Sequence, residues 1–144
     1  MPIREVFTYL CARDAAAALA FYAAAFDARE TMRLNMPDGR VGHAEMALGA
    51  TTLMLSDEFP EVGIEAPDAS RGASVTIHLH VDDADEVIAR ALAAGAVLLV
   101  PARDQSHGER SGAVRDPFGH RWLIGHHLED VSPDEMQRRL DAGA

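Results

Sequence analysis

Apolar and polar side chains alternate in several short stretches of this chain, and other stretches show helical spacing. Alternation predicts strands, because successive side chains on a strand point to opposite faces of a sheet. In the first half, a strand is followed by a helix and then by three more strands. These elements are predicted at about 3–11, 15–26, 29–36, 41–48 and 51–57. Asp14 is placed to cap the helix, which is rich in alanine.

The second half repeats this order at an offset of about 69 residues. Residues 58–73 contain prolines, glycines and acidic side chains, which favours a linker. The repeated elements are predicted at about 75–81, 84–94, 96–102, 109–115 and 120–127. Asp83 and Ser132 each precede a glutamate by three residues, so both form capping boxes, the second for a short helix over 133–141.

The pattern therefore predicts an α+β fold of two βαβββ modules, at about 3–57 and 74–127, followed by a short C-terminal helix. We expect residues 1–144 to form a single domain in which two curved mixed sheets surround a cavity and the helices lie outside. A cavity enclosed by sheets is a common place for a small molecule to bind.

Composition narrows the possible partners. The formal net charge of −10 disfavours binding to nucleic acid or to anionic lipid. The single cysteine, Cys11, cannot form an internal disulfide, and the amino terminus lacks the features of a secretory signal, so we expect a cytoplasmic protein. We expect no membrane partner, since the longest apolar run is far too short to span a bilayer.

Strand alternation also selects the side chains that face the cavity. They combine aromatic and thioether surface with a few polar groups, which is typical of a small-molecule pocket. The predicted ligand-binding residues are Phe7, Tyr9, His43, Glu45, Met54, Thr76, His78, Arg121 and Leu123. Each also has a structural alternative: the aromatic residues could fill the core, Arg121 could pair with Glu45, and His78 could bond to a neighbouring side chain or to water.

Two local motifs resemble a known family. Phe21-Tyr22 in the first helix and Asp116-Pro117-Phe118-Gly119-His120 before the last strand are similar to those of the vicinal oxygen chelate superfamily. That superfamily includes glyoxalase I, extradiol dioxygenases, fosfomycin-modifying enzymes and bleomycin-resistance proteins. The resemblance covers nearly the whole chain and implies the paired βαβββ fold more strongly than any one activity.

The resemblance also implies four positions for a shared metal ion. Counted from the two motifs, they fall on Phe7, Met54, Thr76 and Leu123. None of these offers an imidazole or a carboxylate, which are the ligands that such divalent metals need. We therefore expect no metal and no other cofactor.

The leading hypothesis is a metal-independent protein of the glyoxalase or bleomycin-resistance type that binds a largely apolar ligand. One alternative is a glyoxalase-like lyase or a dioxygenase whose metal site has shifted to His43, Glu45, His78 and His80. Another is a metal-free enzyme in which His78 acts as a base. The identity of the ligand does not follow from the sequence.

We predict a homodimer, because eight strands on 144 residues leave sheet edges that need to be covered. Light scattering at tens of micromolar protein should give twice the mass of one chain. A monomeric mass at that concentration would contradict this prediction.

Overall fold

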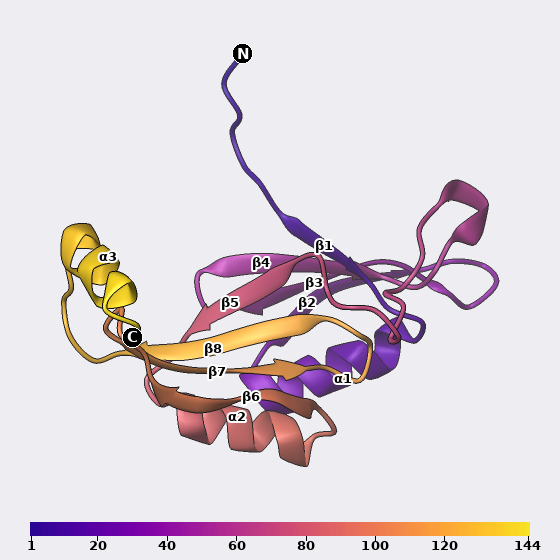
Figure 1. Ribbon diagram of the computed structural model, residues 1–144. Coiled ribbons are helices and arrows are strands. Elements are labelled where there is room, and N and C mark those ends of the chain that lie inside the picture. Colours follow the sequence, from indigo (N-terminus) through magenta and orange to yellow (C-terminus); the bar gives the residue numbers. More distant parts are fainter. The chain divides into compact units, whose positions relative to one another are not determined.

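The computed structural model describes residues 1–144 and divides into two compact units. Unit 1 comprises residues 1–73 and 117–119, and unit 2 comprises residues 74–116 and 120–144. Each unit contains a four-stranded mixed sheet with a helix that follows its first strand (Figure 1). The fold is therefore α+β, as the alternation pattern predicts.

Unit 1 contains a parallel pair of strands formed by its first and last strands. Its elements are β1 (Thr8–Cys11), α1 (Ala15–Phe26), β2 (Arg29–Asn35), β3 (Val41–Leu48) and β4 (Thr51–Ser56). The sheet order is β1-β4-β3-β2, with β1 parallel to β4 and the other pairs antiparallel. Beyond β4, the predicted linker region forms one short 3-10 helix, η1 (Pro60–Val62).

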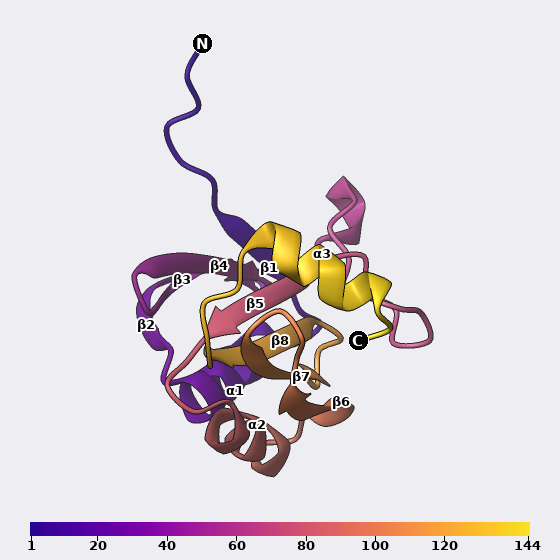
Figure 2. The same cartoon turned by 60° about the vertical axis from the view of Figure 1, so that its left-hand side comes forward.

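Unit 2 has the same topology, which confirms the internal repeat (Figure 2). Its elements are β5 (Thr76–His80), α2 (Ala84–Ala93), β6 (Val97–Asp104), β7 (Glu109–Arg115), β8 (Arg121–His127) and α3 (Pro133–Asp141). The sheet order is β5-β8-β7-β6, and β5 runs parallel to β8. No helix of the chain is both long and apolar enough to cross a membrane.

The predicted caps are present at all three α-helices. The side chains of Asp14, Asp83 and Ser132 accept hydrogen bonds from the backbone N–H groups three residues later, at 3.0, 3.2 and 3.2 Å. These bonds satisfy donors that the first helical turn leaves without partners. The starts of the helices could therefore be predicted from local sequence alone.

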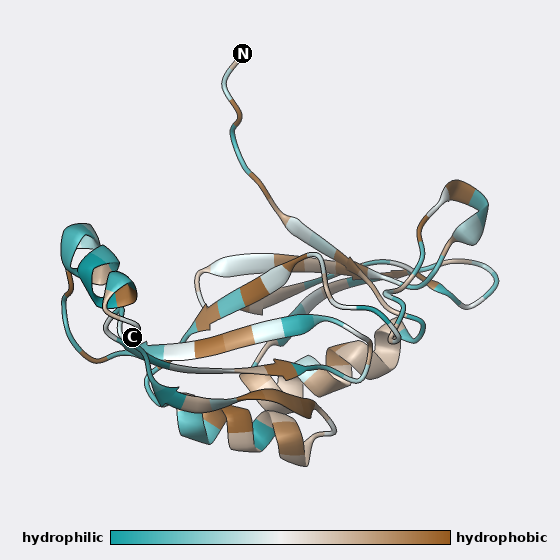
Figure 3. Ribbon diagram, viewed as in Figure 1, coloured by the Kyte–Doolittle hydropathy of each residue, from teal (hydrophilic) through white to brown (hydrophobic).

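In each unit, one face of the sheet is buried and carries the larger apolar side chains. In unit 1 these are Leu10, Met46, Leu53 and Leu55, and in unit 2 they are Val114, Trp122 and Ile124. The helices α1 and α2 contribute buried residues of their own, whereas α3 contributes none. Figure 3 shows α3 mainly in hydrophilic colours, in agreement with its exposure.

The first strand of each unit is shorter than predicted. β1 begins at Thr8, and Val6 is 84% exposed. Val75 likewise precedes β5 and is 66% exposed, so these two valines, which alternation over the predicted strands would put on the buried face, are not buried. The reason in unit 2 is pairing: Thr76 lies opposite Arg121, where the partner strand β8 begins, so Val75 lies beyond the end of that strand. In unit 1 the register would put Val6 opposite Thr51, the first residue of β4, but pairing begins only at Thr8 and Leu53.

The turn between β7 and β8 is held by a buried carboxylate. Asp116 is 3% exposed, and its side chain accepts a 2.8 Å hydrogen bond from Trp122 Nε1 and a 3.1 Å bond from the His120 backbone N–H. The backbone of Asp116 also donates to the His120 carbonyl at 2.9 Å. The Asp-Pro-Phe-Gly-His segment is thus a turn whose first residue fixes the indole of the following strand.

The tip of this turn, residues 117–119, belongs to unit 1. Phe118 is buried, and its ring lies edge-on to that of Phe21, with 6.4 Å between centroids. Arg13 donates a 2.6 Å hydrogen bond to the Pro117 carbonyl, and its guanidinium lies 5.7 Å from the Phe118 ring centroid. This segment therefore completes the packing around α1.

Replacing Asp116 by alanine should destabilise the protein by about 2–4 kcal/mol, because the buried indole N–H and a backbone N–H both lose a charged acceptor. Denaturant unfolding followed by the fluorescence of Trp122, the single tryptophan, measures this. Asp134→Ala, at an exposed carboxylate in the first turn of α3, is the control and should change little. Equal effects of the two substitutions would contradict the role given to Asp116.

Candidate functional site

The predicted ligand-binding residues fall into two groups, one in each unit. In unit 1, Tyr9 lies in β1, His43 and Glu45 in β3, and Met54 in β4, while Phe7 directly precedes β1. In unit 2, Thr76 and His78 lie in β5, and Arg121 and Leu123 in β8. Alternation places the strand residues on the sheet face opposite the buried one, so we call these the open faces of the two units.

The open face of unit 1 is a row of side chains across all four strands. The register pairs Tyr9 with Met54, Met54 with Glu45, and Glu45 with Met32. Large apolar side chains remain accessible there: Tyr9 is 50% exposed and Leu34, opposite His43, is 54% exposed. Apolar surface of this kind, gathered on one face, is a common feature of binding sites.

Three polar side chains on this face form a continuous hydrogen-bonded chain. The Tyr9 hydroxyl lies 2.7 Å from His43 Nδ1, and His43 Nε2 lies 2.8 Å from Glu45 Oε2. An ionised Glu45 can only accept, so a neutral His43 carries its proton on Nε2 and offers Nδ1 as an acceptor. Tyr9 then donates to His43, and its phenolic oxygen keeps lone pairs that can accept a hydrogen bond from a ligand.

Burial raises the pKa of the Tyr9 phenol, and the negative charge of Glu45 raises it further. The hydroxyl therefore stays protonated at neutral pH, as the direction of donation requires. His43 and Glu45 lie two residues apart on β3, which places the carboxylate where it orients the imidazole. The hydrogen bond between Tyr9 and His43 was not predicted, because Tyr9 lies on β1 and His43 on β3, with β4 between them.

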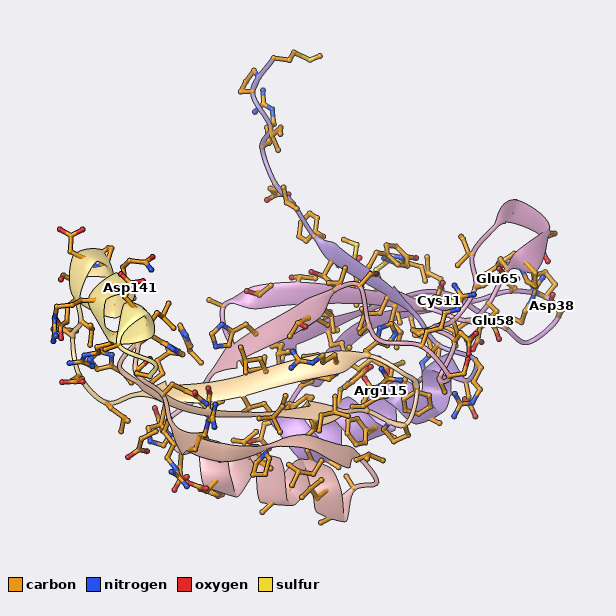
Figure 4. The ribbon with its side chains drawn as sticks, in the orientation of Figure 1. Cys11, Asp38, Glu58, Glu65, Arg115 and Asp141 are labelled. Atoms are coloured by element: carbon orange, nitrogen blue, oxygen red, sulfur yellow. The ribbon has the colours of Figure 1, made fainter.

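Cys11 is on the same strand as Tyr9 but is not activated. Burial raises the pKa of its thiol to about 11, and Glu58, Asp57 and Glu65 add to the effect. Figure 4 shows Cys11 together with the labelled Glu58 and Glu65. A thiol in acidic surroundings is a poor nucleophile at neutral pH, so a cysteine-based reaction is not supported here.

On the open face of unit 2, the predicted residues lie on two adjacent parallel strands. Thr76 is opposite Arg121, and His78 is opposite Leu123. Arg121 donates a 2.9 Å hydrogen bond to Thr76 Oγ1, so its guanidinium is held along the sheet. Burial and the neighbouring His80 lower the pKa of His78, while Glu109 opposes this shift.

A second polar group on this face was only partly predicted. His78, His80 and Glu109 bring their ligand atoms within 4.8 Å of one another. His80 Nε2 is 2.9 Å from Glu109 Oε1, and His78 Nε2 and His107 Nε2 are each 3.7 Å from Glu109 Oε2. The donor set fits a divalent transition metal.

Glu109 is absent from the predicted site residues because strand register does not follow from local sequence. Glu109 pairs with His127 and Ser111 with Gly125, while His80 also pairs with Gly125. These pairings place Glu109 on the same face as the two histidines. Only the order of strands, which is a long-range property, could have brought it into the predicted set.

A pocket of about 650 Å³ adjoins this second group, and unit 2 alone forms its lining. The lining residues include His78, His80, His107, Glu109, His127 and Met136. None of these lining residues is among the positions that the family resemblance assigns to a metal, although Leu123 lies opposite His78. Those positions carry neither an imidazole nor a carboxylate, so they supply no suitable metal ligand: they are Phe7, Met54, Thr76 and Leu123.

Comparison with known proteins identifies the family. The model of the Glyoxalase/Bleomycin resistance protein/Dioxygenase superfamily matches residues 5–124. This chain belongs to that superfamily. An uncharacterized protein of Mycobacterium bovis is 41% identical over 137 residues, which cover 93% of this chain and 90% of the relative.

Solved structures of this superfamily fold are also similar. TioX from Micromonospora sp. ML1 is 26% identical, with a TM-score of 0.67 over 88% of this chain and 100% of TioX. A glyoxalase-related enzyme from Fulvimarina pelagi is 26% identical, with a TM-score of 0.68 over 87% of this chain and 89% of the enzyme. Superfamily membership fixes the fold but leaves the ligand of this chain open.

At pH 7.5 we expect Cys11 to react with iodoacetamide about two orders of magnitude more slowly than an ordinary thiol, because so little thiolate is present. The rate should increase with pH up to about 11. Glu58→Gln should accelerate the reaction, whereas Glu86→Gln on α2 should not. A midpoint near the ordinary thiol value would contradict the structure.

Proposed function

We propose that this protein binds a small, flat, largely apolar molecule that carries a hydrogen-bond donor, on the open face of unit 1. The observation that carries the proposal is the Tyr9, His43 and Glu45 chain. It ends in a phenolic oxygen on an otherwise apolar, accessible sheet face. Superfamily membership supports a small-molecule role, and bleomycin resistance proteins are among the types that the family description names.

The two parts of this face contribute differently to binding. Apolar contact with side chains such as Met32, Leu34 and Met54 supplies most of the affinity, since removing apolar area from water stabilises by about 25 cal/mol per Å². The hydrogen bond to Tyr9 selects among ligands of similar shape. Its net contribution is about 0.5–1.5 kcal/mol, because the ligand exchanges a bond to water for a bond to the protein.

The chain itself needs no metal for this role. Glu45 holds His43 in one tautomer, and His43 Nδ1 accepts the hydrogen bond from the Tyr9 hydroxyl. The Tyr9 oxygen, which is the acceptor for the ligand, is therefore oriented before the ligand arrives. Preorganisation of this kind reduces the entropy that binding costs. This makes the metal-independent binding protein the function that unit 1 supports best.

A matched pair of probes tests the proposal: 2-naphthol, which carries a donor, and 2-methoxynaphthalene, which does not. Tyr9→Phe should weaken binding of 2-naphthol by about 2- to 10-fold and leave 2-methoxynaphthalene unchanged. Leu34→Glu should weaken binding of both, because it places a charge on the apolar face. Fluorescence titration of each variant measures the dissociation constants.

Leu140→Glu is the matched control, since Leu140 on α3 is 58% exposed and Leu34 is 54% exposed. It should bind both probes as the unaltered protein does. If the Leu140 and Leu34 variants lose affinity equally, or if neither probe binds, the proposed site is wrong. If Tyr9→Phe weakens both probes equally, the hydroxyl does not act as the acceptor.

A further inference from the structure

We propose that His78, His80 and Glu109 form a binding site for a divalent transition-metal ion on the open face of unit 2. His78 and His80 are two residues apart on β5, so their imidazoles lie on the same side of the sheet. Their ring centroids are 4.5 Å apart. Glu109 begins β7 and extends its carboxylate toward both rings.

The spacing of the ligand atoms suits one ion. Bonds of about 2.1 Å to a tetrahedral zinc ion place neighbouring ligand atoms roughly 3.4 Å apart. Here His80 Nε2 lies 2.9 Å from Glu109 Oε1, and His78 Nε2 lies 3.7 Å from Glu109 Oε2. These two distances bracket the expected value. Small rotations of exposed side chains are enough to reach the ligand geometry, because His80 is 69% and His78 40% exposed.

Gly125 allows Glu109 to reach the histidines. β8 lies between β5 and β7, and Gly125 is opposite both His80 and Ser111. A Cβ at this position would lie 3.4 Å from Glu109 Oε2 and 3.1 Å from Ser111 Cβ. A larger side chain on the intervening strand would therefore occupy the space across which the carboxylate and the imidazoles meet.

Gly108, the residue before Glu109, fixes the position of the backbone from which the Glu109 side chain extends. Gly108 has φ +95°, a conformation that side chains disfavour, and a Cβ there would lie 2.3 Å from the Glu129 carbonyl oxygen. The turn from His107 to Glu109 is therefore closely held against the chain after β8. The Leu128 and Glu129 backbone N–H groups both donate to the Gly108 carbonyl, at 2.9 and 3.1 Å.

Two imidazoles and one carboxylate favour zinc and the late first-row metals over magnesium and calcium, which prefer oxygen ligands alone. Three protein ligands leave at least one coordination position for water or a small ligand. The adjoining pocket of about 650 Å³ gives that position access. His107 Nε2, which lies 3.7 Å from Glu109 Oε2, is a further imidazole beside the carboxylate.

None of the three residues is among the positions that the family resemblance assigns to a metal, and all three belong to unit 2, whereas the proposed ligand face consists of unit 1 residues. If an ion binds here, the sequence-based expectation of a metal-free protein is wrong. The shifted-site alternative is then correct for His78 and His80, with Glu109 in place of His43 and Glu45.

Calorimetric titration of chelator-treated full-length protein with Zn²⁺ tests the proposal, and the visible absorption of bound Co²⁺ reports coordination. We expect one ion per chain. His80→Ala and Glu109→Gln should each weaken Zn²⁺ binding at least about 100-fold. Loss of a residue that only hydrogen-bonds to a metal ligand already weakens binding by up to about 100-fold, so loss of a ligand should cost no less. Gly125→Val should weaken it as well, because the side-chain atoms beyond Cβ would enter the space beside Glu109.

His127→Ala is the matched control, because His127 lines the same pocket but pairs with Asp130. It should leave the Zn²⁺ affinity unchanged. Equal loss in the His127 and His80 variants, or equal binding by all variants, would overturn the site. Trp122 fluorescence checks that each variant is folded. Naphthol binding by the Glu109 variant should be normal, so failure of one proposal is distinguishable from failure of the other.

Discussion

One helix in each βαβββ module can cover only one face of its four-stranded sheet. Side chains alternate along a strand. Every second residue therefore faces the rest of the unit, and the residues between them lie on the uncovered face. In unit 1, Leu53 and Leu55 are buried while Met54 between them is not. In unit 2, Trp122 and Ile124 are buried while Leu123 is only partly covered. The chemistry of the chain gathers on the faces that remain.

The two polar clusters on these faces are each formed within one sheet. His43 and Glu45, two residues apart on β3, bond to each other and to Tyr9 across β4. His78 and His80, two residues apart on β5, meet Glu109 across β8. In both cases a polar pair on one strand is completed by a residue two strands away. The internal repeat has thus produced two different donor sets from the same arrangement of strands.

Local sequence predicted the parts of the fold that depend on local interactions. The starts of α1, α2 and α3 follow from Asp14, Asp83 and Ser132, whose side chains bond within their own first turns. Alternation likewise placed His43 and Glu45 on one face. It failed at Val75, because β8 begins opposite Thr76 and the end of a strand depends on its partner. It also failed at Val6, which is exposed although β4 extends to the position opposite it.

The same limit applies to the candidate sites. Tyr9 was predicted as a ligand contact but not as the partner of His43, and Glu109 was not among the predicted site residues. Each belongs to its cluster only through the order β1-β4-β3 or β5-β8-β7, which no short stretch of sequence encodes. Residue type and spacing identify candidates, whereas strand order decides which of them meet.

The assignment of residues 117–119 to unit 1 has a consequence for synthesis on the ribosome. Residues 1–73 emerge first, yet Phe118, which packs on Phe21, is made only after β5, α2, β6 and β7. Chains grow at about 5–20 residues per second, so the nascent first unit waits several seconds with α1 incompletely covered. A chain that ended at residue 73 would remain in that state, because it would lack Phe118.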